Sequence, residues 1–215
     1  MTQKERQERS KEEICQAAME EFGTLGYDKV TMERICGNHG ISKGMMYHYY
    51  SNKDELFLLC VERTFTDLKS HVARGMKVLD GQAFLNAIKD FFMLRESYFQ
   101  LHPRKRVIFE DALLHPPKHL VERIQELRGP IRELNRQFIR QIVKKMPLRP
   151  EVDPQMAARY LESVEYFFQS VMRNYQGGRV EADLHTMFET AGEILDMVLF
   201  GIMRQSEPGE QPPSA

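Results

Sequence analysis

The chain has 215 residues, enough for one or two domains with a sizeable hydrophobic core. Its net charge is −1, and residues 1–53 carry eight Lys or Arg against eight Asp or Glu, so bulk charge does not mark a nucleic-acid binder. No apolar run approaches the ~18 residues of a membrane span, and the N-terminus MTQKERQERSKEE has no apolar signal region, so we expect no membrane partner.

The three cysteines, Cys15, Cys36 and Cys60, are odd in number, far apart and set among apolar helical positions. This usage favours a reduced, intracellular and therefore cytoplasmic protein. Metal binding with a nearby His is the alternative, but no CxxC or HxxxH pattern stands on a predicted helix. We expect three small buried hydrophobic side chains, no metal site and no cofactor.

Helical periodicity dominates the chain from its start, and no strand-like alternation persists. In the first ~50 residues, Gly26 suits the left-handed end of one helix, while Thr31 and Ser42 suit the N-caps of two more. The predicted helices of this part span residues 10–25, 32–38 and 43–49.

Longer helices follow, and their predicted spans are 53–75, 84–99, 103–114, 118–146, 154–176 and 182–203. Gly129–Pro130 interrupts the span 118–146, yet the apolar positions stay in phase, which favours one kinked helix. The sequence thus predicts an all-α fold of about nine helices. We expect a three-helix DNA-binding domain over 1–52, a larger ligand-binding and dimerisation domain over 53–205, and a disordered tail over 206–215.

The segment TMERICGNHG-ISKGMMYHYY has the form of a helix-turn-helix, two short helices joined by a glycine turn. Ile41, Met46 and Tyr50 are spaced to meet the core. The outward positions would then be Lys43, Gly44, Met45, Tyr47, His48 and Tyr49.

An exposed aromatic surface of this size favours a partner, and DNA fits it. The amides of residues 42–44, beginning at Ser42, would favour a phosphate, and Gly44 would allow close approach to the groove. The tyrosine hydroxyls would bond phosphate oxygens, while the rings pack on sugars and thymine methyls. The alternative is a packing domain with its aromatic rings on the helix at 53–75. It accounts for Tyr50 and in part Tyr49, but not for Lys43, Tyr47 and His48 together.

The ordered set of motifs from residue 14 to residue 57 resembles the DNA-binding region of the tetracycline-repressor (TetR) family of bacterial transcription regulators. The set comprises Ala-Ala and Phe, Gly-Tyr, Thr, Gly-Ile-Ser-Lys-Gly, Tyr-His-Tyr-Tyr and Asn-Lys-x-Glu-Leu-Phe. The rest of the chain matches the family in length and helical pattern alone.

The resemblance implies roles for individual positions. Thr31 and Lys53 would contact phosphates, and Tyr47, His48 and Tyr49 would line the backbone and groove edge. The base-approaching residues would be Lys43, Gly44 and Met45. Two features depart from the family: Met45 replaces a small or polar residue, and CGNHG replaces an alanine-rich helix end.

Because one short helix reads few bases, helix-turn-helix readers usually act as dimers on two-fold sites. In the resembled family the last two helices form a four-helix interface. The apolar stripes of the last two predicted helices suit either this interface or internal core. The candidate interface residues are Tyr160, Val164, Phe168, Leu195, Leu199 and Ile202.

Aromatic residues of the larger domain would suit an apolar or aromatic ligand, with plain core packing as the alternative. Arg95 lies on the same apolar stripe and must be paired or reach solvent. A pair with Glu110, Asp111 or Glu165 and contact with an acidic ligand both remain open. The candidate ligand residues are Phe91, Phe92, Arg95, Tyr98, Phe99, Phe109 and Phe167.

Five basic residues recur at every fourth position: Arg128, Arg132, Arg136, Arg140 and Lys144. Four-residue steps advance about 40° each, so this set winds about 160° around a helix and reads as a solvated surface. The charged residues before residue 10 are also interpreted as a solvated surface. The alternative is an arm that enters the DNA minor groove through Lys4, Arg6 and Arg9.

The sequence therefore predicts a dimeric repressor that leaves a palindromic double-stranded operator when it binds a small apolar or aromatic effector. The alternative is an architectural or partner-controlled DNA-binding protein with no small-molecule effector. No nucleophile–base pair, phosphate-binding glycine loop or metal spacing suggests catalytic residues, so we do not expect an enzyme.

Overall fold

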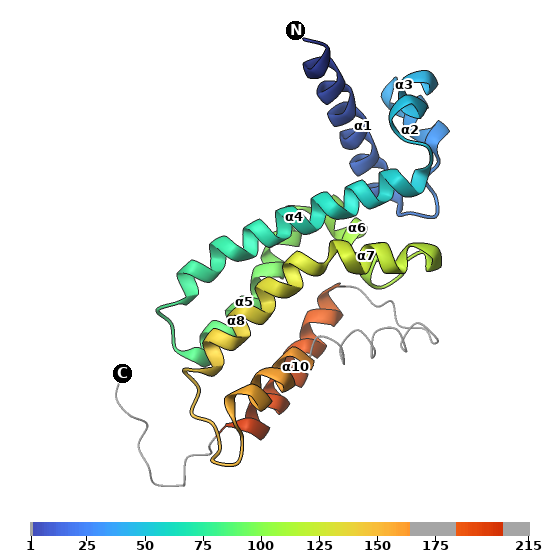
Figure 1. Ribbon diagram of the computed structural model, residues 1–215. Helices are drawn as coiled ribbons and strands as arrows, with labels where there is room; N and C mark the ends of the chain where they lie inside the picture. Colours follow the sequence, from blue (N-terminus) through green and yellow to red (C-terminus); the bar gives the residue numbers. More distant parts are fainter. Residues whose placement is uncertain (1, 164–183, 204–215) are drawn as a thin grey trace. The chain divides into compact units, whose positions relative to one another are not determined.

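The computed structural model describes residues 2–163 and 184–203 (Figure 1). The named helices are α1 (Gln3–Leu25), α2 (Met32–His39), α3 (Lys43–Tyr49), α4 (Lys53–Leu79), α5 (Phe84–Leu101), α6 (Pro103–Leu113), the 3-10 turn η1 (Lys118–Leu120), α7 (Val121–Leu127), α8 (Gly129–Val143) and α10 (Leu184–Ile202). Residues 154–163 are also helical. Over the described ranges the only β-pairing is an isolated antiparallel bridge between Leu148 and Met203, and the predicted all-α fold is confirmed.

Helix α1 begins seven residues earlier than the sequence predicted. Thr2 caps it, because its side chain accepts a hydrogen bond from the Glu5 amide at 3.2 Å. The Glu5 carboxylate in turn accepts from the Thr2 amide at 2.7 Å. This reciprocal capping box extends the helix through a polar segment that apolar periodicity could not detect.

The predicted kinked helix over 118–146 is divided into η1, α7 and α8, with Arg128 between the last two. Pro130 lacks the backbone donor that a continuous helix would need at this point. Ile124 and Ile131 are both buried, so the apolar phase does persist across the break, as predicted.

The described chain forms two compact units. The first unit contains residues 1–74 and 94–132, and the second contains 75–93 and 133–215. This division does not coincide with the predicted boundary at residue 52, because α6 packs on α1 and joins the three N-terminal helices to later segments. The predicted tail, 206–215, lies outside the described residues.

The core of the first unit is built on Phe22 of α1 and Phe57 of α4, whose ring centroids lie 5.3 Å apart. Tyr27 packs against Phe57 at 4.9 Å. The three cysteines are buried and free, as the sequence predicted.

Helices α1 and α6 cross in very close contact at Gly23. A Cβ atom at this position would lie 2.6 Å from Arg104 Cβ and 2.8 Å from the Arg104 carbonyl oxygen. An ion pair of 2.6 Å between Arg104 and Glu20 flanks the crossing. Near the other end of α6, Asp111 Oδ2 accepts a hydrogen bond from the Tyr27 amide at 2.6 Å. Helix α6 is therefore attached to α1 at both ends.

The second unit has its own apolar packing. Phe91 of α5 stacks on Phe138 of α8 with 3.9 Å between ring centroids. Ion pairs join Lys89 to Asp196 at 3.4 Å and Lys145 to Asp80 at 3.1 Å. Phe91, a candidate ligand residue, therefore contributes to core packing.

Replacing Gly23 by Ala should destabilise the protein, because the new methyl group meets Cβ and backbone atoms of Arg104, which cannot swing away. Overpacking of this kind costs about 1–3 kcal/mol, more than the helix propensity that Ala gains. Urea denaturation should show a lower midpoint. Gly37→Ala is the matched control: a Cβ there meets nothing within 4 Å, so this change should raise the midpoint. A Gly23→Ala midpoint at or above wild type would contradict the close crossing.

Candidate nucleic-acid interface

Helix α3 is fixed at both ends by local hydrogen bonds. Gly40, at φ 66°, ends α2 in the left-handed conformation, and Ser42 Oγ then accepts from the Met45 amide at 3.1 Å. Ile41 and Met46 are buried, and they anchor the short helix to the first unit. The sequence predicted these caps and anchors.

The opposite face of α3 is open to solvent. Lys43, Gly44 and His48 are exposed, and Tyr47 retains 48% of its surface. Met45 and Tyr49 are half-buried, so they face outward less fully than the sequence predicted. The His48 ring packs edge-on against Tyr49 at 4.7 Å.

Helix α2 supports this face through Glu33, which accepts a hydrogen bond from the Tyr47 hydroxyl at 3.3 Å. Burial and the charge of Glu33 raise the pKa of Tyr47, so the phenol stays protonated at neutral pH and keeps its donor. Thr31 caps α2 by accepting from the Arg34 amide at 3.1 Å. The Thr31 hydroxyl also donates a hydrogen bond to the Glu33 carboxylate, so its predicted phosphate contact stays a prediction.

Lys53 stands at the start of α4 and is oriented by Tyr27. Its ammonium donates to the Tyr27 carbonyl at 3.1 Å and lies 4.1 Å from the centroid of the Tyr27 ring. An ammonium has three donor hydrogens, so this contact leaves two for other acceptors. The predicted phosphate contact of Lys53 stays a prediction.

A buried carboxylate that the sequence analysis missed connects α1 to α2. Glu21 is 7% exposed and accepts from Arg34 Nε at 2.6 Å and from Asn38 Nδ2 at 2.7 Å, and His39 Nε2 lies 3.3 Å away. Burial alone would raise the pKa of Glu21, but the hydrogen bonds from Asn38 and Arg34 lower it. The CGNHG departure was the available signal, since its Asn and His reach this carboxylate.

A second unpredicted network joins the start of α4 to η1. Asp54 accepts a hydrogen bond from the Tyr27 hydroxyl through Oδ1, and its Oδ2 lies 2.8 Å from His119 Nε2. Burial opposes ionisation of Asp54, but the hydrogen bonds from Tyr27 and His119 lower its pKa. Tyr27 is thus bonded to both α4 and α6, which makes it a junction within the first unit.

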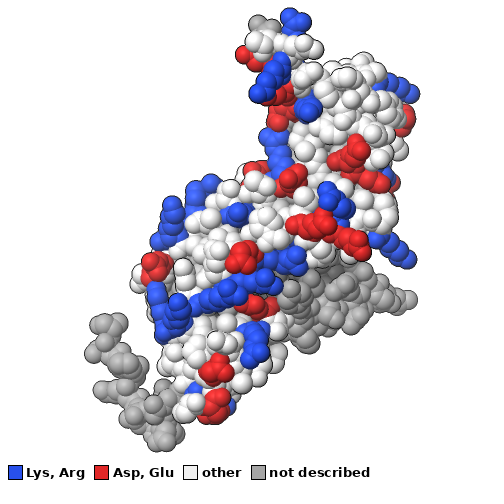
Figure 2. All heavy atoms as spheres, in the orientation of Figure 1, with Lys and Arg blue, Asp and Glu red and all other residues white. Residues whose placement is uncertain are grey.

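The basic row of α7 and α8 is not one solvated surface. Arg128 is 7% exposed, and Arg132 donates to the Gln125 carbonyl at 2.9 Å. Arg136 and Arg140 approach Glu162 at 3.7 and 3.9 Å. Figure 2 shows positive and negative side chains interspersed over the described part of this face. The solvated interpretation fails for Arg128, which turns inward.

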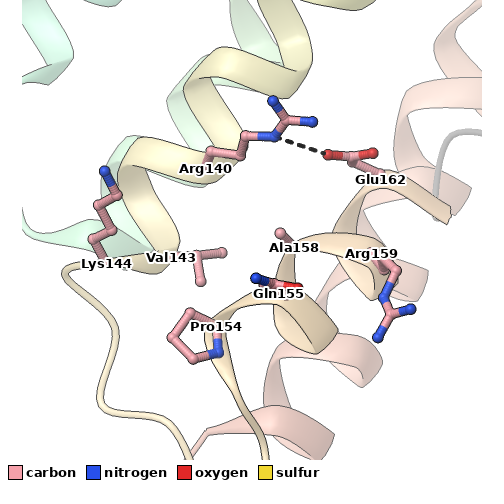
Figure 3. A pocket seen from close by; sticks show the side chains of 8 residues that line it. All are labelled: Arg140, Val143, Lys144, Pro154, Gln155, Ala158, Arg159 and Glu162. Atoms are coloured by element: carbon pink, nitrogen blue, oxygen red, sulfur yellow. Dashed lines mark ion pairs between the residues drawn. The ribbon is translucent and has the colours of Figure 1, made fainter.

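A groove of about 510 Å³ in the second unit holds the end of this row. Arg140 reaches it from α8, Lys144 from the turn directly after α8, and Arg159 from the facing helical segment 154–163 (Figure 3). The three charged ends fan out and do not converge on one point (Figure 3). The groove therefore offers no focused anion site.

The candidate ligand residues divide between the two units. Tyr98, Phe99 and Phe109 meet in the first unit, with centroids 5.2 Å apart for Tyr98–Phe99 and 4.6 Å for Phe99–Phe109. Phe91 and Phe92 belong to the second unit, and Phe167 lies outside the described residues. Arg95 is buried, as its place on the apolar stripe implied, and both interpretations of it remain predictions.

The candidate dimer residues of α10 face the interior of their own chain. Leu195, Leu199 and Ile202 are buried, because steps of four and three residues keep them on one side of the helix. The opposite side carries Met197 and Phe200, which are 66% and 68% exposed. Tyr160 is 47% exposed, and Val164 and Phe168 lie outside the described residues. On α10, the exposed apolar surface is thus formed by Met197 and Phe200 and not by the predicted interface residues.

Over the described ranges, no helix is both long and apolar enough to cross a membrane.

Comparison with a family model finds a match in the helix-turn-helix region. The sequence model of "Bacterial regulatory proteins, tetR family" matches residues 14–60. The HTH-type transcriptional activator FasR of Mycolicibacterium smegmatis is 31% identical over 104 residues, which are 47% of this chain and 46% of FasR. The HTH-type transcriptional repressor AcnR of Corynebacterium jeikeium is 46% identical over 48 residues, 22% of this chain and 25% of AcnR. The chain thus spans less than half the length of each of these two relatives.

Comparison of folds extends further along the chain. The solved complex of SmeT with triclosan superposes with a TM-score of 0.60 at 19% identity, covering 96% of this chain and 99% of that one. The two curated relatives are transcription regulators, in agreement with the expectation that the chain is not an enzyme. The helix-turn-helix over residues 14–60 thus matches the tetR family of bacterial regulatory proteins, the curated relatives are regulators of the helix-turn-helix type, and the all-α fold of the chain agrees with both.

Proposed function

We propose that this protein binds double-stranded DNA and regulates transcription as a dimeric repressor, which a small apolar or aromatic effector releases from a palindromic operator. The exposed face of α3 carries the proposal. Lys43, Gly44 and Tyr47 stand on it side by side, while buried Ile41 and Met46 fix the helix beneath them. A cation, a close-approach position and a phenol donor are the groups that a major groove and its phosphates would engage.

Helix α6 offers a route from an effector to this face. Its contact at Gly23 and the hydrogen bond from the Tyr27 amide to Asp111 attach it to α1. Tyr27 also bonds to Asp54 at the start of α4. A displacement of α6 would therefore act on Tyr27, whose backbone amide bonds to α6 and whose hydroxyl bonds to α4. Through Tyr27 it would reach the helix-turn-helix.

A dimer would use the exposed side of α10. Met197 and Phe200 are one turn apart there, and both leave most of their apolar surface in water. If two copies of the chain paired through these side chains, they would bury apolar area. The dimer would then present two copies of α3 to a two-fold site.

The first experiment tests the DNA-binding face with a site selected from random DNA by the wild-type protein. Lys43→Ala and Tyr47→Ala should each lower affinity for this site by at least about tenfold while the thermal midpoint stays within a few degrees of wild type. Lys53→Ala should weaken binding to all sequences and reduce the salt slope by about one. Lys118→Ala, an exposed lysine outside the face, is the control and should bind as wild type. Unchanged affinity in all three test variants would refute the proposal.

Gly44→Ala separates recognition from stability. A Cβ at residue 44 meets nothing within 4 Å in the free protein, so Ala should stabilise α3 by about 0.5–1 kcal/mol. The same methyl group would stand between the helix and the groove, so affinity for the selected site should fall. Titration by fluorescence anisotropy beside urea denaturation measures both. A variant that is more stable and binds equally well would show that Gly44 does not approach DNA.

The oligomeric state tests the revised interface. Sedimentation should give about twice the chain mass of 25.2 kDa for the wild type. Met197→Asp combined with Phe200→Asp should give the mass of one chain, because four charges would be buried without partners. Val78→Asp, at a side chain that is 73% exposed, is the matched control and should stay dimeric. A monomeric wild type at micromolar concentration would remove the dimer from the proposal.

Linkage tests the effector. Native mass spectrometry of protein purified from cells would identify any retained compound. A coupling of roughly 1–3 kcal/mol would lower operator affinity 5–150-fold, and operator DNA must weaken binding of that compound by the same factor. Equal compound affinity with and without DNA would instead favour a regulator controlled by protein partners.

A further inference from the structure

Three buried polar atoms of the first unit, on α4 and α5, form no hydrogen bond among the described residues. They are Thr64 Oγ1 and His71 Nε2 on α4, and the Tyr98 hydroxyl on α5. Thr64 is fully buried and Tyr98 is 3% exposed. A buried polar group without a partner costs about 1–3 kcal/mol, and most native proteins hold few of them. Because the three atoms lie on neighbouring helices, a bound ligand between these helices could supply the missing hydrogen-bond partners.

His71 and Tyr98 lie close enough to share one partner, since their ring centroids are 5.2 Å apart. The Leu94 carbonyl bonds to the His71 ring, and because Nε2 has no partner this contact falls to Nδ1. In the neutral ring Nδ1 then carries the proton and Nε2 is an acceptor. The Tyr98 hydroxyl can both donate and accept. One group that donates to His71 and accepts from Tyr98 would complete both residues, and a hydroxyl does this.

The neighbouring charges leave this pair intact at neutral pH. Burial, together with the charges of Arg74 and His102, lowers the pKa of His71, so the ring is neutral at pH 7. Burial also raises the pKa of Tyr98, although the charge of the Lys105 ammonium and its contact with the hydroxyl oppose this. An ammonium can only donate, so this contact leaves the Tyr98 hydroxyl hydrogen for another acceptor. Lys105 is itself held by Asp67 at 2.6 Å. A carboxylate has no hydrogen to donate, so its oxygens would be repelled by the lone pair of His71 Nε2. An uncharged hydroxyl can donate its hydrogen to that lone pair.

Apolar rings of the same unit continue from the polar pair. Phe99 packs on Tyr98 at 5.2 Å and on Phe109 at 4.6 Å, and Phe109 packs edge-on against Phe65 at 5.9 Å. Thr64 stands seven residues before His71, which places it about 10 Å away on the same face of α4. The occupant that fits is therefore mainly apolar and carries a hydroxyl at one end.

We propose that the effector is an apolar compound bearing an alcohol or phenol hydroxyl, which donates to His71 Nε2 and accepts from the Tyr98 hydroxyl. This rests on the proposed effector-controlled function and specifies its ligand class. Such a ligand would lie against α4, whose first turn holds Tyr27 through Lys53 and Asp54. Its insertion between α4 and α5 would thus act on the helix that joins the effector residues to the helix-turn-helix.

The unliganded protein gives the first test. If the Tyr98 hydroxyl has no structural partner, Tyr98→Phe removes an unpaired polar group and should leave the thermal midpoint unchanged or raise it. Ser70→Ala is a matched hydroxyl deletion at an exposed site of α4 and should also stay near wild type. A clearly lower midpoint for Tyr98→Phe alone would show that a structural partner, such as bound water, already satisfies the hydroxyl, and would overturn the proposal.

Three matched probes give the second test: 4-hydroxybiphenyl, 4-methoxybiphenyl and biphenyl. The first can donate and accept, the second can only accept, and the third does neither. By calorimetry the wild type should bind 4-hydroxybiphenyl at least about tenfold more tightly than the other two, which corresponds to about 1.4 kcal/mol. Tyr98→Phe and His71→Leu should each reduce this preference below threefold, and Ser70→Ala should preserve it. Equal binding of the three probes, a preference that survives both variants, or no binding of any probe would overturn the proposal.

The pH dependence distinguishes a hydroxyl from an acid. As pH falls through the lowered pKa of His71, Nε2 gains a proton and loses its acceptor lone pair, so 4-hydroxybiphenyl affinity should fall in acid and stay flat from neutral to mildly alkaline pH. Biphenyl-4-carboxylate would behave oppositely and gain affinity in acid, and tighter binding of this probe at pH 7 would contradict the assignment. DNA binding by Ser70→Ala without any probe should match wild type. Loss of DNA binding in the wild type itself would refute the proposed function, whereas the probe results refute only the ligand class.

Discussion

The close crossing of α6 over α1 at Gly23 is the constraint on which the first unit depends. No side chain larger than hydrogen fits between Gly23 and the backbone of Arg104, so the two helices meet without intervening side chains. Glu20 and Asp111 then hold the ends of α6 through an ion pair and a backbone hydrogen bond. Because these contacts are short and direct, α6 cannot shift without moving α1, and α1 carries the surface on which α2 and α3 pack.

Tyr27 converts that rigid crossing into a junction. Its amide bonds to α6, its hydroxyl bonds to Asp54 of α4, and its carbonyl and ring hold Lys53. Tyr27, two residues beyond the end of α1, therefore contacts both α4 and α6, the helices that could carry an effector signal. The helix-turn-helix can thus be coupled to later helices through a few local bonds, and no continuous path of packed side chains is needed.

The sequence predicted the parts of the site that follow from local rules. The caps at Thr31 and Ser42, and the inward Ile41 and Met46, depend on neighbours within a few residues, so their roles could be read directly. Contacts between distant segments could not. Glu21 on α1 meets Asn38 on α2, and Asp54 meets His119, and no periodicity encodes either pair. The interface predicted from the apolar stripe of α10 differs from the structure for a related reason. An apolar stripe indicates that its residues are buried, but it does not indicate whether the same chain or a second copy covers them.

The buried atoms of His71 and Tyr98 bear on how such a protein can be both stable and responsive. When all buried polar groups of a core already form hydrogen bonds with each other, a ligand gains no free energy by entering it, because it would only replace bonds that exist. A core with an unpaired acceptor beside an unpaired hydroxyl is less stable than it could be, and a ligand that pairs both regains that free energy only in the bound state. That difference between the two states is what a regulator needs, since a ligand shifts an equilibrium only by its differential interaction with the two conformations. Placed against α4, whose first turn holds Tyr27, the unpaired atoms lie where such a difference would reach the helix-turn-helix.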